Sequence, residues 1–185
     1  GQNVCAAATA TWHALSPTSP AQVRAAIAAI RSVATTFAGL PHRIEFLKEV
    51  EGVRYYNDSF ATGLHATTAA IEAINGPKVM ILGGFERMLP LEHFAQFVKA
   101  HQNEFRTLLL IGQSAERLGQ VLRSEGFSNF TLDATSKTMP AIVVAARDLA
   151  QPGDAVVLSP DFASFDMFKN FEERGNLFRD TVNAL

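Results

Sequence analysis

The sequence predicts an α/β fold in which helices cover both faces of a largely parallel β-sheet. Short apolar runs alternate with amphipathic runs from residue 66 to the C-terminus, and strands buried on both faces appear in sequence as such apolar runs. Before them, two β-rich runs are joined by Glu51-Gly52, a turn signal that adds an antiparallel hairpin at one edge of the sheet. Two helical runs in the first 38 residues complete the prediction.

The two N-terminal helices are expected to form a domain of their own. Residues 2–15 carry small residues with helical propensity, and Trp12 supplies one bulky anchor. A Pro-containing break follows, in which Ser19 suits the N-cap and Pro20 the first position of a second helix. Gly39-Leu-Pro41 ends that helix. We therefore expect one domain over residues 1–38 and a second over residues 39–185.

The second domain is expected to hold the sheet. The hairpin strands are predicted over residues 44–50 and 53–56, and four further strands over residues 78–82, 107–111, 130–132 and 155–158. The covering helices are predicted over residues 66–74, 91–101, 115–124, 139–150 and 168–184.

Composition narrows the class of protein. The chain has 185 residues, of which 48% are hydrophobic, a globular value. Its net charge of −2 and the absence of a basic run argue against nucleic-acid or anionic-membrane partners. A single cysteine, Cys5, together with the lack of a secretory signal or an apolar run long enough to span a bilayer, leads us to expect a cytoplasmic protein. Because Gly1 begins the chain inside a helical pattern, we expect a piece of something longer.

Three loops carry candidate functional side chains. Residues 57–63 follow a strand, and their polar side chains could bind a ligand, with Asp58 on ribose hydroxyls and Thr62 on a carboxylate or phosphate, or simply cap the next helix. Gly83-Gly84, with Arg87 close behind, lets backbone approach a ligand or merely turn. At the domain boundary, Arg43 could reach a phosphate, whereas His42 more often has a packing role than a chemical one.

Other familiar kinds of site are argued against. Ser164, Asp166 and Lys169 lack the Gly-x-Ser-x-Gly turn of a serine hydrolase. The five histidines are dispersed, so no metal site is predicted. No Gly-x₄-Gly-Lys-Ser/Thr phosphate loop occurs anywhere in the sequence.

The stretch from Ala155 to Gly175 is the most informative. It is predicted as a buried strand, a loop rich in small and hydroxyl residues, and a helix, an arrangement that places backbone N–H groups at the carboxyl edge of a sheet. With three earlier motifs in order, Gly39–Arg43, Asn57–Thr62 and Gly83-Gly84 with Arg87, residues Ser159–Gly175 resemble the C-terminal domain of the Mur ligases, and especially the members that add D-glutamate. The resemblance covers residues 39–185, while residues 1–38 resemble the last helices of the family's central ATPase domain.

The resemblance implies a Rossmann-like domain that closes over an ATP-bearing central domain. It implies an ATP-dependent ligase of peptidoglycan synthesis that joins D-glutamate to UDP-N-acetylmuramoyl-L-alanine through an acyl phosphate, with water excluded on closure. It also implies that ATP and Mg are bound mainly by the central domain, so this chain alone is expected to be inactive. A monomer acting on small molecules, with no nucleic-acid or membrane partner, is expected.

Residue roles follow from the same resemblance. Arg43 matches a phosphate-contacting arginine, Asp58 a ribose-binding aspartate, and Asn3 the first Asn of a nucleotide-binding pattern. The remaining matches surround the D-glutamate carboxylate: Thr62, Ser164 and Phe171, with Phe165 beside them and Arg87 where many members have lysine. An arginine there offers a bidentate fork for a carboxylate.

Two departures keep other readings open. Phe60 stands where some members have lysine, and Ala6 replaces the second Asn of the nucleotide-binding pattern, which contacts adenine. A related Mur-type or folylpolyglutamate-type ligase with another amino-acid substrate is the first alternative. A non-catalytic binding module on the same fold is the second.

Overall fold

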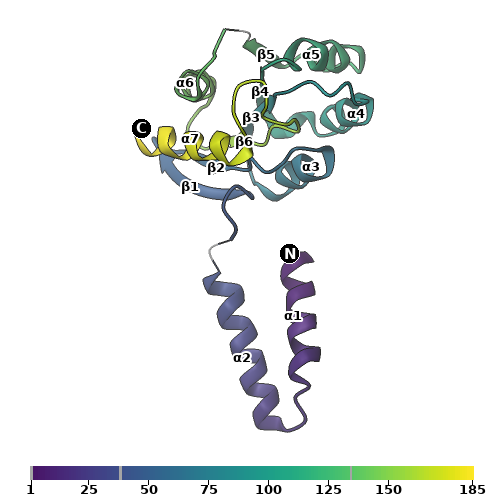
Figure 1. Cartoon of the computed structure of the whole chain (residues 1–185), viewed down its shortest axis with the longest axis vertical. Coiled ribbons are helices and arrows are strands. Elements are labelled where there is room, and N and C mark those ends of the chain that lie inside the picture. Colours follow the sequence, from purple (N-terminus) through teal and green to yellow (C-terminus); the bar gives the residue numbers. More distant parts are fainter. Residues whose placement is uncertain (1, 38, 134) are drawn as a thin grey trace. The chain divides into compact units, whose positions relative to one another are not determined.

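The computed structural model describes residues 2–37, 39–133 and 135–185, without the side chains of residues 2–4 and 64. The chain divides into two compact units, Gly1–Gly39 and Leu40–Leu185. Among the described helices, none is long and apolar enough to cross a membrane. The first unit is helical, and the second contains the sheet (Figure 1).

The first unit is a hairpin of two helices, α1 (Gln2–Leu15) and α2 (Pro20–Thr36). α2 begins as predicted: the Ser19 side chain accepts from the backbone of Gln22, and the Gln22 side chain accepts in return from Ser19 N–H. An apolar groove runs between the helices and is lined mainly by alanines of both, with Ile30 and Phe37. The hairpin therefore presents an open apolar face within its own unit.

The second unit is built on one six-stranded sheet with the order β1-β2-β6-β3-β4-β5. Its strands are β1 (Glu45–Val50), β2 (Val53–Asn57), β3 (Lys78–Gly83), β4 (Phe105–Ile111), β5 (Phe130–Asp133) and β6 (Ala155–Leu158). β1 pairs antiparallel with β2 around the predicted Glu51-Gly52 turn, and every other pairing is parallel. The predicted α/β class, with its antiparallel edge hairpin, is confirmed.

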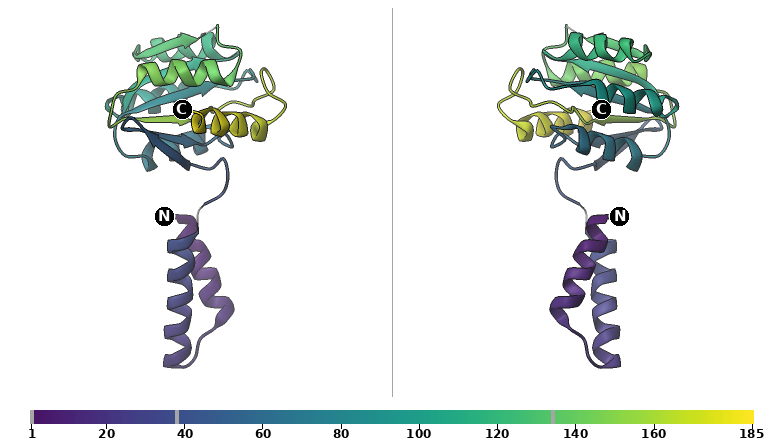
Figure 2. Two further views of the ribbon diagram at one scale, coloured as in Figure 1. Left: turned by 90° about the vertical axis from the view of Figure 1, so that its left-hand side faces the viewer. Right: turned by 90° about the vertical axis from the view of Figure 1, so that its right-hand side faces the viewer.

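Helices cover both faces of this sheet, and each face has its own apolar core (Figures 1 and 2). One face packs against α3 (Leu64–Ala73), α4 (Glu92–Ala100) and α5 (Ala115–Ser124), with Phe94 and Leu118 at its centre. The other face packs against α6 (Met139–Leu149) and α7 (Phe171–Asn183), with Ile142 and Phe178 at its centre. A short 3₁₀ helix, η1 (Gln102–Glu104), leads into β4. β3 is buried at every position, as a strand covered on both sides must be.

One predicted helix start is wrong. α7 was expected from Phe168, but it begins at Phe171 because Asn170 is its N-cap and accepts from Glu173 N–H. Residues 159–170 therefore form a longer loop than predicted, and within it the carbonyl of Ser164 accepts from Met167 and Phe168 N–H. The extra loop length lies at the carboxyl edge of the sheet.

The carboxyl ends of the five parallel strands meet at one edge, where the loops after β2, β3, β4 and β6 lie together. Paired glycines permit this crowding. A Cβ at Gly83 would collide with the carbonyl of Ile111, and one at Gly84 would collide with the carbonyl of Ala163. Both glycines also have positive φ, which other residues rarely adopt. The backbone of three loops is thus packed tightly where ligands bind in such folds.

Candidate functional site

The loop after β2 is held by its own carboxylate. Asp58 is buried, and its two oxygens accept from Ile44 N–H (3.0 Å) and from the Ser159 hydroxyl (2.7 Å). Burial raises the pKa of Asp58 to about 6, although these hydrogen bonds and the charge of Arg43 act to lower it. The alternative role as a helix cap does not hold, because α3 has Gly63 at its N-cap position and no side-chain cap. Asp58 ties the entry of β1 to the loop after β6.

Arg43 and two phenylalanines form a second part of the site. The Arg43 guanidinium lies 4.1 Å from the centre of the Phe60 ring, a cation–π contact. Phe60 in turn meets Phe171 edge to face, with ring centres 4.9 Å apart. Arg43 is itself exposed, so its N–H groups remain accessible to an anion. Phe60 therefore supports the Arg43 guanidinium from one side.

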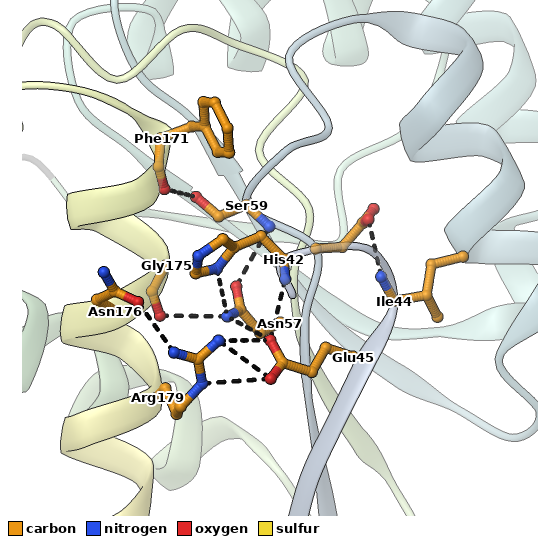
Figure 3. Close-up of polar contacts among 10 residues, drawn as sticks. His42, Ile44, Glu45, Asn57, Ser59, Phe171, Gly175, Asn176 and Arg179 are labelled. Atoms are coloured by element: carbon orange, nitrogen blue, oxygen red, sulfur yellow. Dashed lines mark hydrogen bonds and ion pairs between the residues drawn. The ribbon is translucent and has the colours of Figure 1, made fainter. Parts of the chain in front are cut away.

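His42 belongs to a buried polar network (Figure 3). The Asn57 side-chain nitrogen lies 2.9 Å from His42 Nδ1 and donates to Glu45 and to the carbonyl of Gly175. Arg179 of α7 forms a two-pronged ion pair with Glu45 at 2.9 and 3.2 Å. Burial lowers the pKa of His42, and the Arg179 charge lowers it further.

The network gives His42 a packing role, which was the expected one, rather than a chemical role. The Asn57 amide nitrogen lies beside His42 Nδ1, and burial disfavours the charged form of the ring. For Glu45, burial acts to raise the pKa, but the Arg179 and His42 hydrogen bonds outweigh it and hold the pKa below its usual value. The network fixes the start of β1, and with it Arg43, against α7.

Arg174 was not singled out from the sequence, although it lies in the Ser159–Gly175 motif. Its side chain is only 1% exposed and has three backbone or hydroxyl acceptors in place of a carboxylate partner. It donates to the Ser59 hydroxyl (3.0 Å), the Ser59 carbonyl (2.9 Å) and the Phe162 carbonyl (3.1 Å). Burial lowers its pKa to about 10, so it remains charged near neutral pH. Arg174 thus joins α7 to the loops after β2 and β6.

Arg87 and Thr62 come together on the other side of the loop after β2. The Arg87 guanidinium donates to the Thr62 carbonyl at 2.7 Å and is otherwise exposed. Beside them is a small cavity of about 70 Å³, whose walls include Gly63, Arg87 and Asp161. The backbone N–H of Asp161 donates to the Ala61 carbonyl at 3.0 Å, which fixes this cavity to the loop that carries Asp58.

The other residues matched to the D-glutamate pocket lie on the loop after β6. Ser164 is buried, and its carbonyl closes the turn to Phe168. Phe165 is 66% exposed and meets the Phe85 ring edge to face at 6.2 Å. Asp166 accepts from Gln113 N–H at 3.0 Å, which links this loop to the loop after β4.

Two clusters therefore form one edge, since residues 58–63 run between them: Arg43 with Phe60 and Phe171, and Arg87 with Thr62. The side chain of Asn3 lies outside the described residues. Within the described part of the chain, no group of three or more His, Cys, Asp or Glu side chains could hold a metal ion. An exposed arginine in each cluster makes the edge suitable for anionic groups.

Comparison with known proteins finds a family and named relatives for this chain. The family described as "Mur ligase, glutamate ligase domain" matches residues 42–162. Relatives named UDP-N-acetylmuramoylalanine–D-glutamate ligase include those of Acetivibrio thermocellus, 40% identical over 161 residues, and Symbiobacterium thermophilum, 38% identical over 184 residues. These alignments cover 84% and 100% of this chain but only 34% and 37% of the relatives. The chain thus spans about a third of the length of these relatives.

A solved structure shares the fold. The MurF ligase from Thermotoga maritima, in complex with ADP, aligns with a TM-score of 0.53 over 88% of this chain and 38% of its own. At 14% sequence identity, this likeness concerns the fold alone.

Proposed function

The chain belongs to the Mur ligase family, and we propose that it supplies the amino-acid-binding part of a ligase that adds D-glutamate to UDP-N-acetylmuramoyl-L-alanine in peptidoglycan synthesis. The observation that carries this proposal is the exposed Arg87 guanidinium, which lies against the Thr62 carbonyl beside a cavity at the carboxyl edge of the sheet. A fixed guanidinium in this position is suited to binding a carboxylate of the incoming amino acid.

The amino-acid pocket is proposed to extend from Arg87 along the neighbouring loops. Thr62 and Ser164 would offer hydroxyl donors to the same carboxylate, and the rings of Phe165 and Phe171 would cover its carbon chain. The exposure of Phe165 leaves its ring accessible for such a contact. The names of the relatives, which specify D-glutamate, support this choice of amino acid.

The nucleotide is proposed to meet the same edge through Arg43 and Asp58. The exposed guanidinium of Arg43 suits a phosphate of ATP, and Phe60 restrains it. Asp58 already accepts two hydrogen bonds, but each carboxylate oxygen has a second lone pair that a ribose hydroxyl could use. Asn3 is proposed to contribute a nucleotide contact from the first unit.

Residues 1–38 are proposed to be the last helices of a central ATPase domain, and residues 39–185 the domain that closes over it. When ATP phosphorylates the substrate carboxylate, the amine of D-glutamate attacks the resulting acyl phosphate and phosphate leaves. The cationic side chains at this edge would stabilise the charge that develops in that step. Closure would keep water from the acyl phosphate. ATP and Mg are proposed to be bound mainly outside this chain, and the ligase to act as a cytoplasmic monomer.

The test is an activity assay of the full ligase that carries this domain. We expect ADP release with ATP and UDP-N-acetylmuramoyl-L-alanine to depend on D-glutamate, and to be far weaker with L-glutamate or diamino acids. A preference for another amino acid would instead support the first alternative, a related Mur-type or folylpolyglutamate-type ligase. No turnover with any amino acid would support a binding module.

A further inference from the structure

Asp161 is the least explained side chain of the site. It is 7% exposed, and its Oδ1 has no hydrogen-bond partner among the residues that the structure describes. Its φ is +64°, a left-handed conformation uncommon for residues with a side chain. Buried polar atoms are nearly always paired, and strained backbone tends to occur at functional sites. A bound group that completes Asp161 would account for both features.

The surroundings of Asp161 limit what that group can be. The cavity that it lines is small, about 70 Å³, and it can take a small polar group such as an ammonium. A second carboxylate, Glu86, also lines it, but Glu86 is already paired: Arg117 donates to it at 2.8 and 2.9 Å, and Met88 N–H at 2.7 Å. Of the two carboxylates that line the cavity, Asp161 is therefore the one that can still accept a hydrogen bond.

Among the described residues that line the cavity, Arg87 carries the one positive charge near Asp161. That guanidinium donates to the Thr62 carbonyl rather than filling the vacant side of Asp161. Burial raises the pKa of Asp161 to about 7, and Arg87 acts against the rise. An acceptor and an exposed donor thus stand side by side, the arrangement that a zwitterion requires.

We propose that Asp161 binds the ammonium group of the incoming amino acid, while Arg87 binds a carboxylate of the same molecule. This inference rests on the proposed function, because it assigns a second group of the same substrate. Glutamate carries its ammonium and carboxylates on one short carbon chain, so both can reach adjoining walls. An ammonium donates to the unpaired Oδ1 and fits the small cavity, whereas a deaminated dicarboxylate leaves Asp161 unpaired and is repelled by it.

The test compares D-glutamate with glutarate, the same dicarboxylate without the amine, in the full ligase. The measured quantity is the glutarate Ki, in competition with D-glutamate, divided by the D-glutamate KM. We expect this ratio to fall about 10- to 100-fold in Asp161→Asn, the loss of one charge-assisted hydrogen bond. Asn tolerates the left-handed conformation at least as well as Asp, so the variant should fold, which a melting curve verifies. Asp161→Gly also suits the left-handed conformation, and the ratio should fall in it as it does in Asp161→Asn.

A matched control is Asp133→Asn. Asp133 is a buried carboxylate at the carboxyl end of β5, and it accepts from Thr135 and Ser136 within its own loop. Its substitution should leave the ratio unchanged.

An unchanged ratio in both Asp161 variants would overturn the inference, as would equal weakening of D-glutamate and glutarate. If Asp161 holds an inorganic cation, turnover will depend on added potassium while the ratio stays constant, which also overturns it. Should the ligase prefer another amino acid, the proposed function fails. The same ratio, measured with that amino acid and its deaminated analogue, still decides the role of Asp161.

Discussion

At the scale of single residues, the site divides its charges between anchoring and binding. Arg174 is committed to backbone carbonyls and Asp58 to a hydroxyl and an amide, so both hold loops in place. Arg87 and Arg43 are exposed. Arg87 donates to the Thr62 carbonyl, and Arg43 lies over the Phe60 ring. The exposed arginines are therefore the groups that a substrate can engage without breaking the fold.

Arg87→Ala should weaken amino-acid binding selectively. Removing the guanidinium leaves a substrate carboxylate without its partner, at a cost of about 2 kcal/mol or more, or about 30-fold in KM. We expect that rise in the D-glutamate KM, with the ATP KM changed by less than about threefold. Steady-state kinetics of the full ligase measure both. Arg147→Ala, which removes an exposed arginine paired with Asp148 on α6, is the control. An unchanged D-glutamate KM would exclude Arg87 from the site.

The buried carboxyl of Asp161 should make stability depend on pH. Its pKa is about 7 in the folded unit, against about 4 in an unfolded chain. A raised pKa favours folding fully below about pH 4, and that contribution disappears as the pH rises through about 7. The loss is at most about 4 kcal/mol for a shift of this size.

Asp161→Asn removes this titration. Between about pH 4.5 and 7.5, the free energy of unfolding should therefore fall more in the wild-type protein than in the variant. Urea denaturation at several pH values measures the difference. Parallel pH profiles would show that Asp161 ionises normally. Asp58, with its pKa of about 6, contributes in the same direction to both proteins and cancels in the comparison.

At the scale of elements, α7 holds the loops of the site in position. Its residues Arg174, Gly175 and Arg179 contact the loops after β2 and β6 and the start of β1. Gly175 allows the closest approach, since a Cβ there would collide with the His42 ring. The position of Arg43, next to His42 in the chain, thus depends on how closely α7 packs.

Gly175→Ala should therefore destabilise the sheet unit. Overpacking of this kind costs about 1–3 kcal/mol. It should also raise the ATP KM in the full ligase, because displacement of His42 moves Arg43. Thermal melting and kinetics measure the two effects. Gly63→Ala is the control for stability, since a Cβ at that extended residue meets no atom within 4 Å. Equal melting temperatures for the two variants would contradict the tight packing of α7 against His42.

Local signals made most elements predictable, and distant contacts account for the rest. Ser19 and Glu51-Gly52 carry their capping and turn roles within a few residues, so helix and hairpin were predicted correctly. The start of α7 was missed because Phe168 continues an apolar pattern while Asn170 provides the cap. Arg174 was missed as a site residue because its partners lie far from it in the sequence. Asp161 was missed because its burial comes from the folded loops around it.

At the scale of the whole molecule, the sheet unit carries its own core. Both apolar clusters are drawn from residues between 44 and 182, on the two faces of one sheet. The helical hairpin has one buried apolar residue, Ala26, among its described side chains. The two units thus differ in how much apolar surface each buries by itself.

Residues 40–185 should consequently fold without the hairpin. We expect a cooperative melting transition within about 3 °C of that of the 185-residue chain, since neither core loses a residue. Near-UV circular dichroism and thermal melting measure this. Loss of the transition on removing residues 1–39 would show that the sheet unit depends on the hairpin.

The proposed site is tested most directly by a crystal structure of the full ligase with D-glutamate and a non-hydrolysable ATP analogue. We expect a D-glutamate carboxylate within about 3 Å of the Arg87 guanidinium, its ammonium on Asp161, and a phosphate of the analogue at Arg43. D-glutamate bound elsewhere, with Arg87 still donating only to the Thr62 carbonyl, would contradict it.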